Sequence, residues 1–322
     1  MYELAICFST KNRTSNLLNT LKRLLLNKNI KNEKIQITIV DATEFSSYQK
    51  IKNLNLKQKN FYINYIHDPE DLGGLDAAYD KAVRFSDAKY VYLASDDDLI
   101  SENFLTVVLD KIKNNKDLYI LNTNVVDSDL NMTLQENRLK VSNDYEFTYY
   151  KKKKIPNVLI EQLSYIGSIL IRRENWISYD SSKYFNSYFS HLSNIFDSKD
   201  EINIYIISSV LVHCRIDAES WSKKHLILWN FYWPQFKKMI TNGFSELDKS
   251  ELIINISIKT LIKYYALGIL DEIDNIKMSK KLKRKINFIK FFNKKMIAYV
   301  SLIHSVIKKN YILKYRLIKR LT

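Results

Sequence analysis

The sequence from residue 90 to residue 98, Tyr-Val-Tyr-Leu-Ala-Ser-Asp-Asp-Asp, passes from an apolar run to three consecutive aspartates. A short apolar run bounded by polar residues is typical of a buried strand. The run therefore predicts a strand over 90–94 that stops at an acidic turn, defined here as Asp96 to Asp98.

The residues before this strand alternate between strand and helix patterns. Apolar runs predict buried strands over 4–8, 35–40 and 61–66, and helical spacing predicts helices from Thr14 and from Gly73–Gly74. Strands that alternate with helices favour a parallel sheet covered on both faces. We therefore expect an α/β fold with a Rossmann-like, mostly parallel sheet. Ligands of such sheets bind beyond the carboxyl ends of the strands.

The pattern after residue 100 is mixed, and after Trp221 it is entirely helical. We expect one domain over 1–225, with halves 1–100 and 101–225, followed by a helical C-terminal region over 226–322. In the second half we expect a helix over 102–113, an extended segment over 118–126, an exposed polar connection over 127–155, and strands over 164–171 and 202–212 that flank a helix around 184–196.

The composition excludes several classes of protein. The chain has 322 residues, 46% hydrophobic and 26% charged, which excludes a wholly disordered protein. Cys7 and Cys214 are its only cysteines, which excludes a disulfide scaffold. No apolar run reaches the ~18 residues that span a bilayer, and the N-terminus lacks the basic region of a signal peptide. We therefore expect a cytoplasmic protein.

The formal net charge of +15 is concentrated at the C-terminus. Residues 275–322 contain 15 Lys and Arg and no acidic residue, so the charges of residues 1–274 cancel. Apolar residues recur in this basic tail at helical steps of three and four, among them Ile286, Ile289, Phe292, Met296, Val300, Ile303 and Ile307.

A basic amphipathic tail favours contact with an anionic membrane surface. A helical bundle that packs its apolar stripe on the protein is the alternative. A nucleic-acid-binding protein is a third interpretation, but the sequence has no Arg-rich motif or helix-turn-helix signal, so we expect no nucleic-acid partner.

The acidic turn is a candidate metal site. Neighbouring carboxylates at a buried strand end repel one another unless a cation or solvent compensates them. In an extended segment alternate side chains share a face, so Asp96 and Asp98 can meet one ion while Asp97 points elsewhere. Hard oxygen ligands suit Mg²⁺ or Mn²⁺. His213, after the strand over 202–212, is a candidate third ligand, and a solvated acidic turn is the alternative.

Three segments in this order resemble the family 2 glycosyltransferases, which have the nucleotide-sugar-binding GT-A fold. Residues 8–13, Phe-Ser-Thr-Lys-Asn-Arg, resemble that family's opening Pro-Thr-Tyr-Asn-Arg segment. Residues 68–80 resemble its glycine-containing segment, and residues 90–100 resemble its strand and Asp-x-Asp motif. Within the family the sequence looks most similar to the abequosyltransferase-like enzymes of O-antigen and surface-glycan synthesis.

The resemblance implies an inverting transfer of sugar from a nucleotide diphosphate donor to a hydroxyl, assisted by Mg²⁺ or Mn²⁺. The first half would then bind the donor and the second half the acceptor. Three features depart from the family pattern. The turn after the second strand is Asp41-Ala42-Thr43-Glu44, and Tyr79 replaces the usual arginine. The acidic pair that many relatives have around the catalytic base is missing, and residues 189–192, Phe-Ser-His-Leu, stand near its expected place. The donor-binding residues that we expect are Thr10, Asn12, Arg13, Asp41, Asp68, Gly74, Asp96, Asp97 and Arg215.

His191 is the candidate catalytic base, because a neutral imidazole accepts a proton near neutral pH. The alternative is a structural place at the edge of an apolar helix face. Asp217 and Glu219 are the competing carboxylate bases.

The basic tail and the resemblance together predict the acceptor and the location. We expect a lipid-linked bacterial surface glycan as acceptor and a peripheral position on the inner face of the cell membrane. A soluble or protein acceptor is the alternative.

Overall fold

The structure is a computed structural model that describes residues 1–25, 34–54, 61–127, 132–215, 228–245, 247 and 284. The chain divides into two compact units. The first comprises Met1–Glu219 and Phe236–Glu246, and the second comprises Ser220–Gln235 and Leu247–Thr322. The sheet and the candidate site lie in the first unit.

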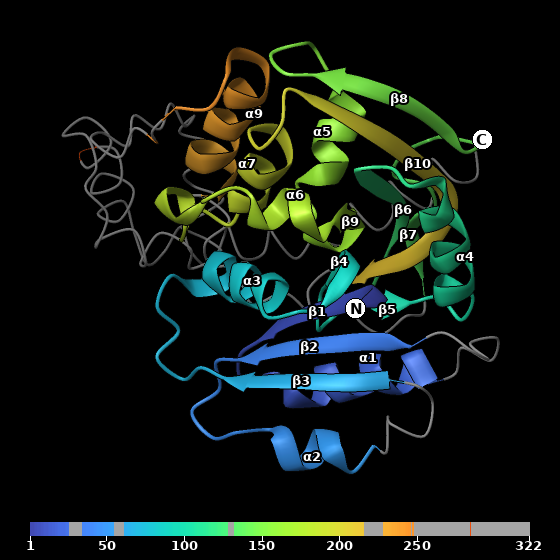
Figure 1. The fold of residues 1–322 in the computed structure, drawn as a ribbon, viewed down its shortest axis with the longest axis vertical. Coiled ribbons are helices and arrows are strands. Elements are labelled where there is room, and N and C mark those ends of the chain that lie inside the picture. The colour runs from blue at the N-terminus through green and yellow to red at the C-terminus, as the bar shows by residue number, and fades with distance from the viewer. Residues whose placement is uncertain are drawn as a thin grey trace, which may run out of the picture. The chain divides into compact units, whose positions relative to one another are not determined.

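In the described residues one sheet contains ten strands, and its main path runs β3-β2-β1-β4-β9-β6-β10-β5 (Figure 1). The remaining two strands pair at the side of this path, β7 with β6 and β8 with β10. The strands are β1 (Tyr2–Thr10), β2 (Ile35–Asp41), β3 (Phe61–His67), β4 (Ala88–Ala94), β5 (Leu99–Ile100), β6 (Leu118–Val126), β7 (Thr133–Gln135), β8 (Tyr145–Tyr150), β9 (Ile169–Arg172) and β10 (Glu201–Arg215).

The first four strands of the path pair in parallel, as expected for strands that alternate with helices. β10 also pairs in parallel with β6, whereas β9 runs antiparallel between β4 and β6. The prediction of an α/β fold with a mostly parallel sheet is confirmed. Each of its antiparallel pairs includes at least one strand from the second half of the chain.

Helices connect these strands. They are α1 (Thr14–Leu25), α2 (Tyr48–Lys52), α3 (Gly74–Arg84), α4 (Phe104–Lys111), α5 (Asn157–Leu163), α6 (Arg173–Ile177), α7 (Ser190–Phe196) and α9 (Trp233–Asn242). Shorter turns of 3₁₀ helix are η2 (Ile112–Asn114), η3 (Ile166–Ser168) and η4 (Ser182–Tyr184), and η6 (Leu228–Tyr232) is a π-helical turn.

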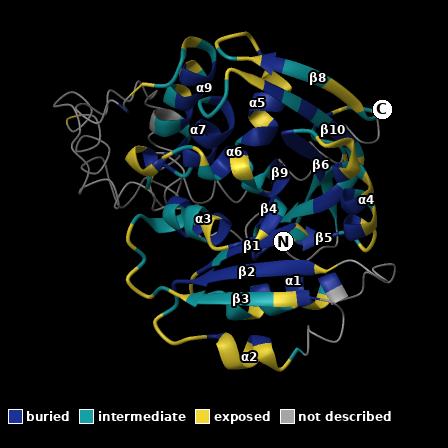
Figure 2. Cartoon of the chain, viewed as in Figure 1, coloured by how far each residue is buried: buried dark blue, intermediate teal, exposed yellow. Residues whose placement is uncertain are grey.

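The two faces of the sheet are covered by different helices. Alternate residues of β1, such as Ile6 and Phe8, join a buried apolar cluster with Leu21 of α1 and Phe104 of α4. α3 packs against β1 and β2, and α6 packs against β4 and β9. Figure 2 shows the resulting contrast between the buried central strands β1, β2 and β4 and the largely exposed helix α2.

Three expectations for the second half need correction. The segment over 127–155 is not only a connection, because it contains β7 and β8. β8 pairs with β10 and leaves several side chains exposed, so its sequence lacks a continuous apolar run.

The other two corrections concern segments that are shorter than expected. The helix around 184–196 is limited to α7, because Asn186 and Tyr188 adopt left-handed backbone conformations, both with φ 67°. The strand over 164–171 is limited to β9, since its first part forms η3.

Several expectations lie outside the described residues. They include the boundary at residue 225 and the basic tail over 275–322, of which only Arg284 is described. Among the described helices, none combines the length and the apolar character needed to cross a membrane.

Replacement of Asp117 by alanine should destabilise the fold. Its carboxylate is 9% exposed and accepts bonds from the Asn203 N–H (2.9 Å), the Asn175 amide (3.0 Å) and the Lys199 ammonium (3.1 Å), so it joins β6 to α6 and β10. Asp117→Ala leaves these donors without an acceptor and should lower the free energy of unfolding by about 3 kcal/mol, measured by urea denaturation.

Glu174→Ala is the matched control for that measurement. The Glu174 carboxylate is 72% exposed and lies 3.8 Å from Arg172, which also lies 3.7 Å from Asp117. Loss of an exposed partner of this kind should change the free energy of unfolding by less than about 0.5 kcal/mol. Equal losses in the two variants would show that Asp117 does not stabilise the sheet.

Candidate active site

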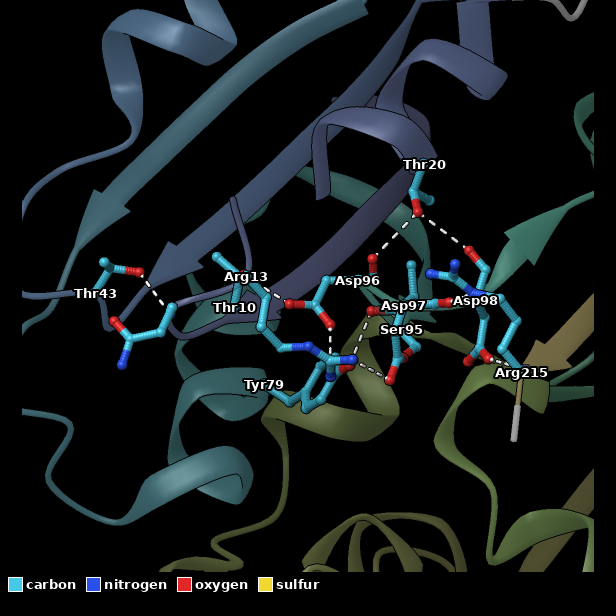
Figure 3. A network of polar contacts seen from close by, with 12 residues as sticks. Thr10, Arg13, Thr20, Thr43, Tyr79, Ser95, Asp96, Asp97, Asp98 and Arg215 are labelled. Atoms are coloured by element: carbon cyan, nitrogen blue, oxygen red, sulfur yellow. Dashed lines mark hydrogen bonds and ion pairs between the residues drawn. The ribbon is translucent and has the colours of Figure 1, made fainter. Parts of the chain in front are cut away.

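The candidate site lies where β1 and β4 end side by side. These strands pair in parallel with Phe8 opposite Ala94, so the segments that follow them emerge at the same edge of the sheet. The Thr10 hydroxyl at the end of β1 donates a hydrogen bond of 2.7 Å to Oδ2 of Asp96. Figure 3 shows the network that surrounds the acidic turn.

Arg13 provides a positive charge beside the carboxylates of this turn. Its guanidinium lies 3.3 Å from Asp96 Oδ1 and 2.7 Å from Asp97 Oδ2 (Figure 3). Asn12, just before it, has a left-handed backbone (φ 57°) and donates its N–H to the Thr43 hydroxyl at 2.9 Å. The tight turn after β1 therefore directs Arg13 toward the carboxylates.

Asp98 is held from the second half of the chain. The backbone N–H of Arg215, the last residue of β10, donates to its Oδ1 at 2.9 Å. The Tyr165 hydroxyl donates to its Oδ2 at 2.5 Å. The Arg215 side chain donates from Nε to the carbonyl oxygen of Asp97 (Figure 3).

Three further hydroxyl groups donate to the acidic turn or to the end of β4 just before it. The Thr20 hydroxyl of α1 lies 3.3 Å from the carbonyl oxygen of Asp96 and 3.1 Å from that of Asp98. The Tyr79 hydroxyl of α3 donates to the Ala94 carbonyl at 2.8 Å, and the Ser95 hydroxyl donates to the Asp97 carboxylate. The helices that cover the sheet therefore also set the position of the turn.

Burial makes the negative charge of this turn costly. Asp96, Asp97 and Asp98 are only 4%, 6% and 4% exposed. Burial raises the pKa of Asp96 to about 6, although the Arg13 charge acts in the opposite direction. Burial, together with the repulsion from Asp97, raises the pKa of Asp98 above its usual value.

The acidic turn fits a divalent cation in charge and in ligand chemistry. The Arg13 guanidinium contacts the carboxylates of Asp96 and Asp97, whereas the Arg215 side chain contacts the Asp97 carbonyl. A divalent cation would favour the charged forms of Asp96 and Asp98, whose pKa values are raised by burial. Carboxylate oxygens are the ligands that Mg²⁺ and Mn²⁺ prefer. Within the described ranges, no three His, Cys, Asp or Glu side chains form a group that could hold a metal ion.

The sequence predicts His213 as a third ligand beside Asp96 and Asp98. In the described part of the chain these three side chains do not form such a group. His213 lies on β10 opposite Leu99 of β5, and its Nδ1 is 2.8 Å from the Asn124 side-chain oxygen. Burial lowers the pKa of this half-buried imidazole.

Asp41 is completely buried at the end of β2. Its carboxylate accepts bonds from the Thr43 N–H (2.9 Å), the Ser47 N–H (3.2 Å) and the Tyr65 hydroxyl (2.6 Å). Burial acts to raise the pKa of Asp41, but these hydrogen bonds outweigh it and lower the pKa. The expected contact with a nucleobase would compete with these internal bonds.

The glycine-containing segment has its own internal contacts. Asp68 pairs with Lys81 of α3, and its N–H donates to the Asp41 carbonyl at 2.9 Å. Gly73 and Gly74 have φ values of 90° and 63°, which a side chain rarely adopts, and a Cβ at Gly74 would lie 2.9 Å from the Asn186 side-chain oxygen.

His191 lies in the protein interior, which opposes the expected role of catalytic base. The side chain is 2% exposed, and its Nε2 is 2.9 Å from the Leu163 carbonyl oxygen. Burial lowers its pKa to about 4. A base must reach the hydroxyl that it deprotonates, so the structure favours the alternative of a structural histidine. The competing bases Asp217 and Glu219 lie outside the described residues.

Sequence reasoning missed two residues that hold the acidic turn, Thr20 and Tyr165. Thr20 is one of several polar residues of the amphipathic helix α1, so the sequence does not distinguish it from the others. Tyr165 is separated from Asp98 by 67 positions, so only the fold brings them together.

Comparison with known proteins identifies one family and one group of structures. Residues 5–177 match the family model described as Glycosyl transferase family 2. The crystal structure of S. aureus TarS 1-349 is similar to the chain with a TM-score of 0.51 and 12% identity, over 84% of this chain and 82% of that one. The structure of the same TarS fragment in complex with UDP gives 0.54 and 13%, over 85% and 81%. No curated protein matches the sequence.

Replacement of His191 by glutamine should remove a pH-dependent loss of stability. The folded protein keeps this imidazole neutral down to a pKa of about 4, whereas an unfolded histidine binds a proton at about 6.5. The contribution of His191 to the free energy of unfolding is therefore fully present above about pH 6.5. It decreases by roughly 3 kcal/mol as the pH falls toward 4. His191→Gln should lack this component and retain a donor for the Leu163 carbonyl.

Urea denaturation of both proteins at about pH 7.5 and about pH 4.5 measures the difference. The wild-type chain should lose more stability on acidification than the variant. The same loss in both would mean that His191 titrates normally and is accessible to solvent.

Proposed function

Because the chain belongs to glycosyl transferase family 2, we propose that it is an inverting enzyme that transfers sugar from a nucleotide diphosphate donor to a hydroxyl of a bacterial surface glycan. The observation that carries this proposal is the buried acidic turn at the edge of the sheet, which forms ion pairs with Arg13 and hydrogen bonds with Arg215. That edge is where α/β proteins bind their ligands.

A nucleoside diphosphate sugar is the proposed donor. TarS, whose structure in complex with UDP is similar in fold, supports this choice of ligand class. The two guanidinium groups next to the acidic turn provide donors of the kind that bind diphosphate oxygens. Thr10, Asn12, Asp68 and Gly74 remain proposed contacts to the donor.

The acidic turn is the proposed site for Mg²⁺ or Mn²⁺, held by Asp96 and Asp98. When bound, such a cation neutralises the charge that develops on the departing diphosphate. Arg13 and Arg215 would orient the diphosphate beside it. His213 is left out of this set because, in the described part of the chain, it is not gathered with the two aspartates into a group that could hold a metal ion.

Transfer with inversion needs a base for the acceptor hydroxyl. The hydroxyl oxygen forms a bond to the anomeric carbon, the bond from that carbon to the diphosphate breaks, and the base takes the proton. Since His191 is buried, Asp217 and Glu219 remain the two candidates. They follow Arg215, which is bonded to Asp98, by two and four residues.

A lipid-linked glycan at the inner face of the membrane is the proposed acceptor. The support for it is the tail over 275–322, with 15 basic and no acidic residues, together with the resemblance to abequosyltransferase-like enzymes.

Nucleotide binding tests the donor and the cation together. Thermal unfolding should be measured with UDP, GDP, CDP and dTDP, each with and without Mn²⁺. One of the four should raise the melting temperature only with Mn²⁺, and Asp98→Asn should weaken this binding at least about tenfold, because it removes a charged ligand.

Asp110→Asn is the control for Asp98→Asn, since it makes the same chemical change at a 65% exposed carboxylate of α4. It should bind as tightly as the wild-type chain. If none of the four nucleotides binds with Mn²⁺, the proposed donor class is wrong.

Membrane binding should depend on the position of the positive charge and not only on its amount. Replacement of Lys280, Lys281, Lys283 and Lys285 by glutamine removes four charges from the tail, and each is worth roughly 1 kcal/mol near an anionic surface. The variant should sediment with anionic vesicles at least about tenfold less well than the wild-type chain.

The control removes four exposed lysines elsewhere, Lys50, Lys52, Lys153 and Lys154. It should lose much less binding to anionic vesicles, and neither protein should bind neutral vesicles. Equal losses in the two variants would instead indicate attraction through net charge alone.

A further inference from the structure

Tyr165 reaches the acidic turn from the loop between α5 and η3. Its hydroxyl donates to Oδ2 of Asp98 at 2.5 Å, while the Arg215 N–H donates to Oδ1 at 2.9 Å. Each carboxylate oxygen of Asp98 therefore has a donor, and the two donors together help to set the plane of the carboxylate.

These donors differ from those of the neighbouring aspartates. Asp96 and Asp97 share the charged guanidinium of Arg13. The donors to the Asp98 carboxylate are neutral: the Tyr165 phenol, the Arg215 backbone amide and the Ser95 hydroxyl. A neutral donor orients a carboxylate without cancelling its charge, so Asp98 keeps its attraction for a cation.

Gly167 provides the space that Tyr165 occupies. A Cβ at position 167 would lie 2.5 Å from the Tyr165 hydroxyl oxygen and 2.6 Å from Cζ of its ring. Both distances are far below van der Waals contact. The Tyr92 hydroxyl donates to the Gly167 carbonyl at 3.1 Å and so holds this peptide in place.

The rest of Tyr165 is also constrained. The Arg138 guanidinium lies over its ring, with Cζ 5.4 Å from the ring centroid. Its carbonyl oxygen accepts bonds from the Ser168 N–H (3.1 Å) and hydroxyl (2.7 Å), and its N–H donates to the Gln162 carbonyl at 3.1 Å. These contacts of the ring and the backbone hold the phenol against Asp98.

We propose that Tyr165 is a positioning residue of the cation and diphosphate site, which orients the Asp98 carboxylate through its hydroxyl, and that Gly167 is required because a side chain there would displace that hydroxyl. This role rests on the proposed function. In this role Tyr165 acts through Asp98, the side chain that its hydroxyl contacts. Because Tyr165 lies directly before η3, the packing of η3 sets the orientation of the Asp98 carboxylate, which follows β4.

The test is the affinity for Mn²⁺ in the presence of UDP, or of whichever of the four nucleotides stabilises the wild-type chain. Tyr165→Phe removes the hydroxyl and keeps the ring under Arg138, and it should raise the apparent Kd for Mn²⁺ about tenfold, as is usual for residues that orient metal ligands. Gly167→Ala should raise it to a similar extent.

Tyr179→Phe is the matched control, because the Tyr179 hydroxyl donates to Asp197 Oδ2 at 2.6 Å, a bond of the same kind away from the acidic turn. Its Mn²⁺ affinity should equal that of the wild-type chain. Its melting temperature without ligand should fall as much as that of Tyr165→Phe, which separates positioning from a general loss of stability.

The double variant links the two residues. If Gly167 acts only through the Tyr165 hydroxyl, Tyr165→Phe combined with Gly167→Ala should bind Mn²⁺ no more weakly than Gly167→Ala alone. Unchanged Mn²⁺ affinity in Tyr165→Phe, or equal weakening in Tyr179→Phe, would overturn the positioning role and leave the proposed function intact. A wild-type chain that binds no nucleotide with Mn²⁺ would overturn both.

Discussion

The repulsion among three consecutive buried carboxylates is the constraint that the candidate site depends on. Asp96, Asp97 and Asp98 are each at most 6% exposed, so water cannot screen them from one another. Such a cluster persists in a folded protein only when donors or cations surround it. Here the compensation comes from Arg13 after β1 and from Arg215 at the end of β10, so the sheet must be complete before the turn is stable.

The compensating groups come from both halves of the sheet. Thr20 on α1 contacts the backbone of the turn, and Tyr165 approaches Asp98 from the loop before η3. The antiparallel insertion of β9 between β4 and β6 places that loop next to the carboxyl end of β4. The change from parallel to antiparallel pairing is therefore part of how the site is built.

Sequence patterns predict the first half of the chain better than the second. The apolar runs over 35–40 and 61–66 correspond to β2 and β3 to within one residue. β2 is buried between two strands, and β3 is the edge strand that covers it. β8 shows no such run, since it is half exposed. At the site, Asp96 to Asp98 stand out in the sequence, whereas Tyr165 and the burial of His191 depend on contacts between distant segments, which no local pattern records.

The acidic turn has strands immediately on both sides, β4 ending at Ala94 and β5 beginning at Leu99. β5 is short, but its pairing with β10 anchors the turn at its second end. A segment this short between two anchored ends has few conformations left to explore. The entropic cost of ordering its carboxylates is therefore met when the chain folds, and a ligand that arrives there finds them preorganised, with little reorganisation energy left to oppose its binding.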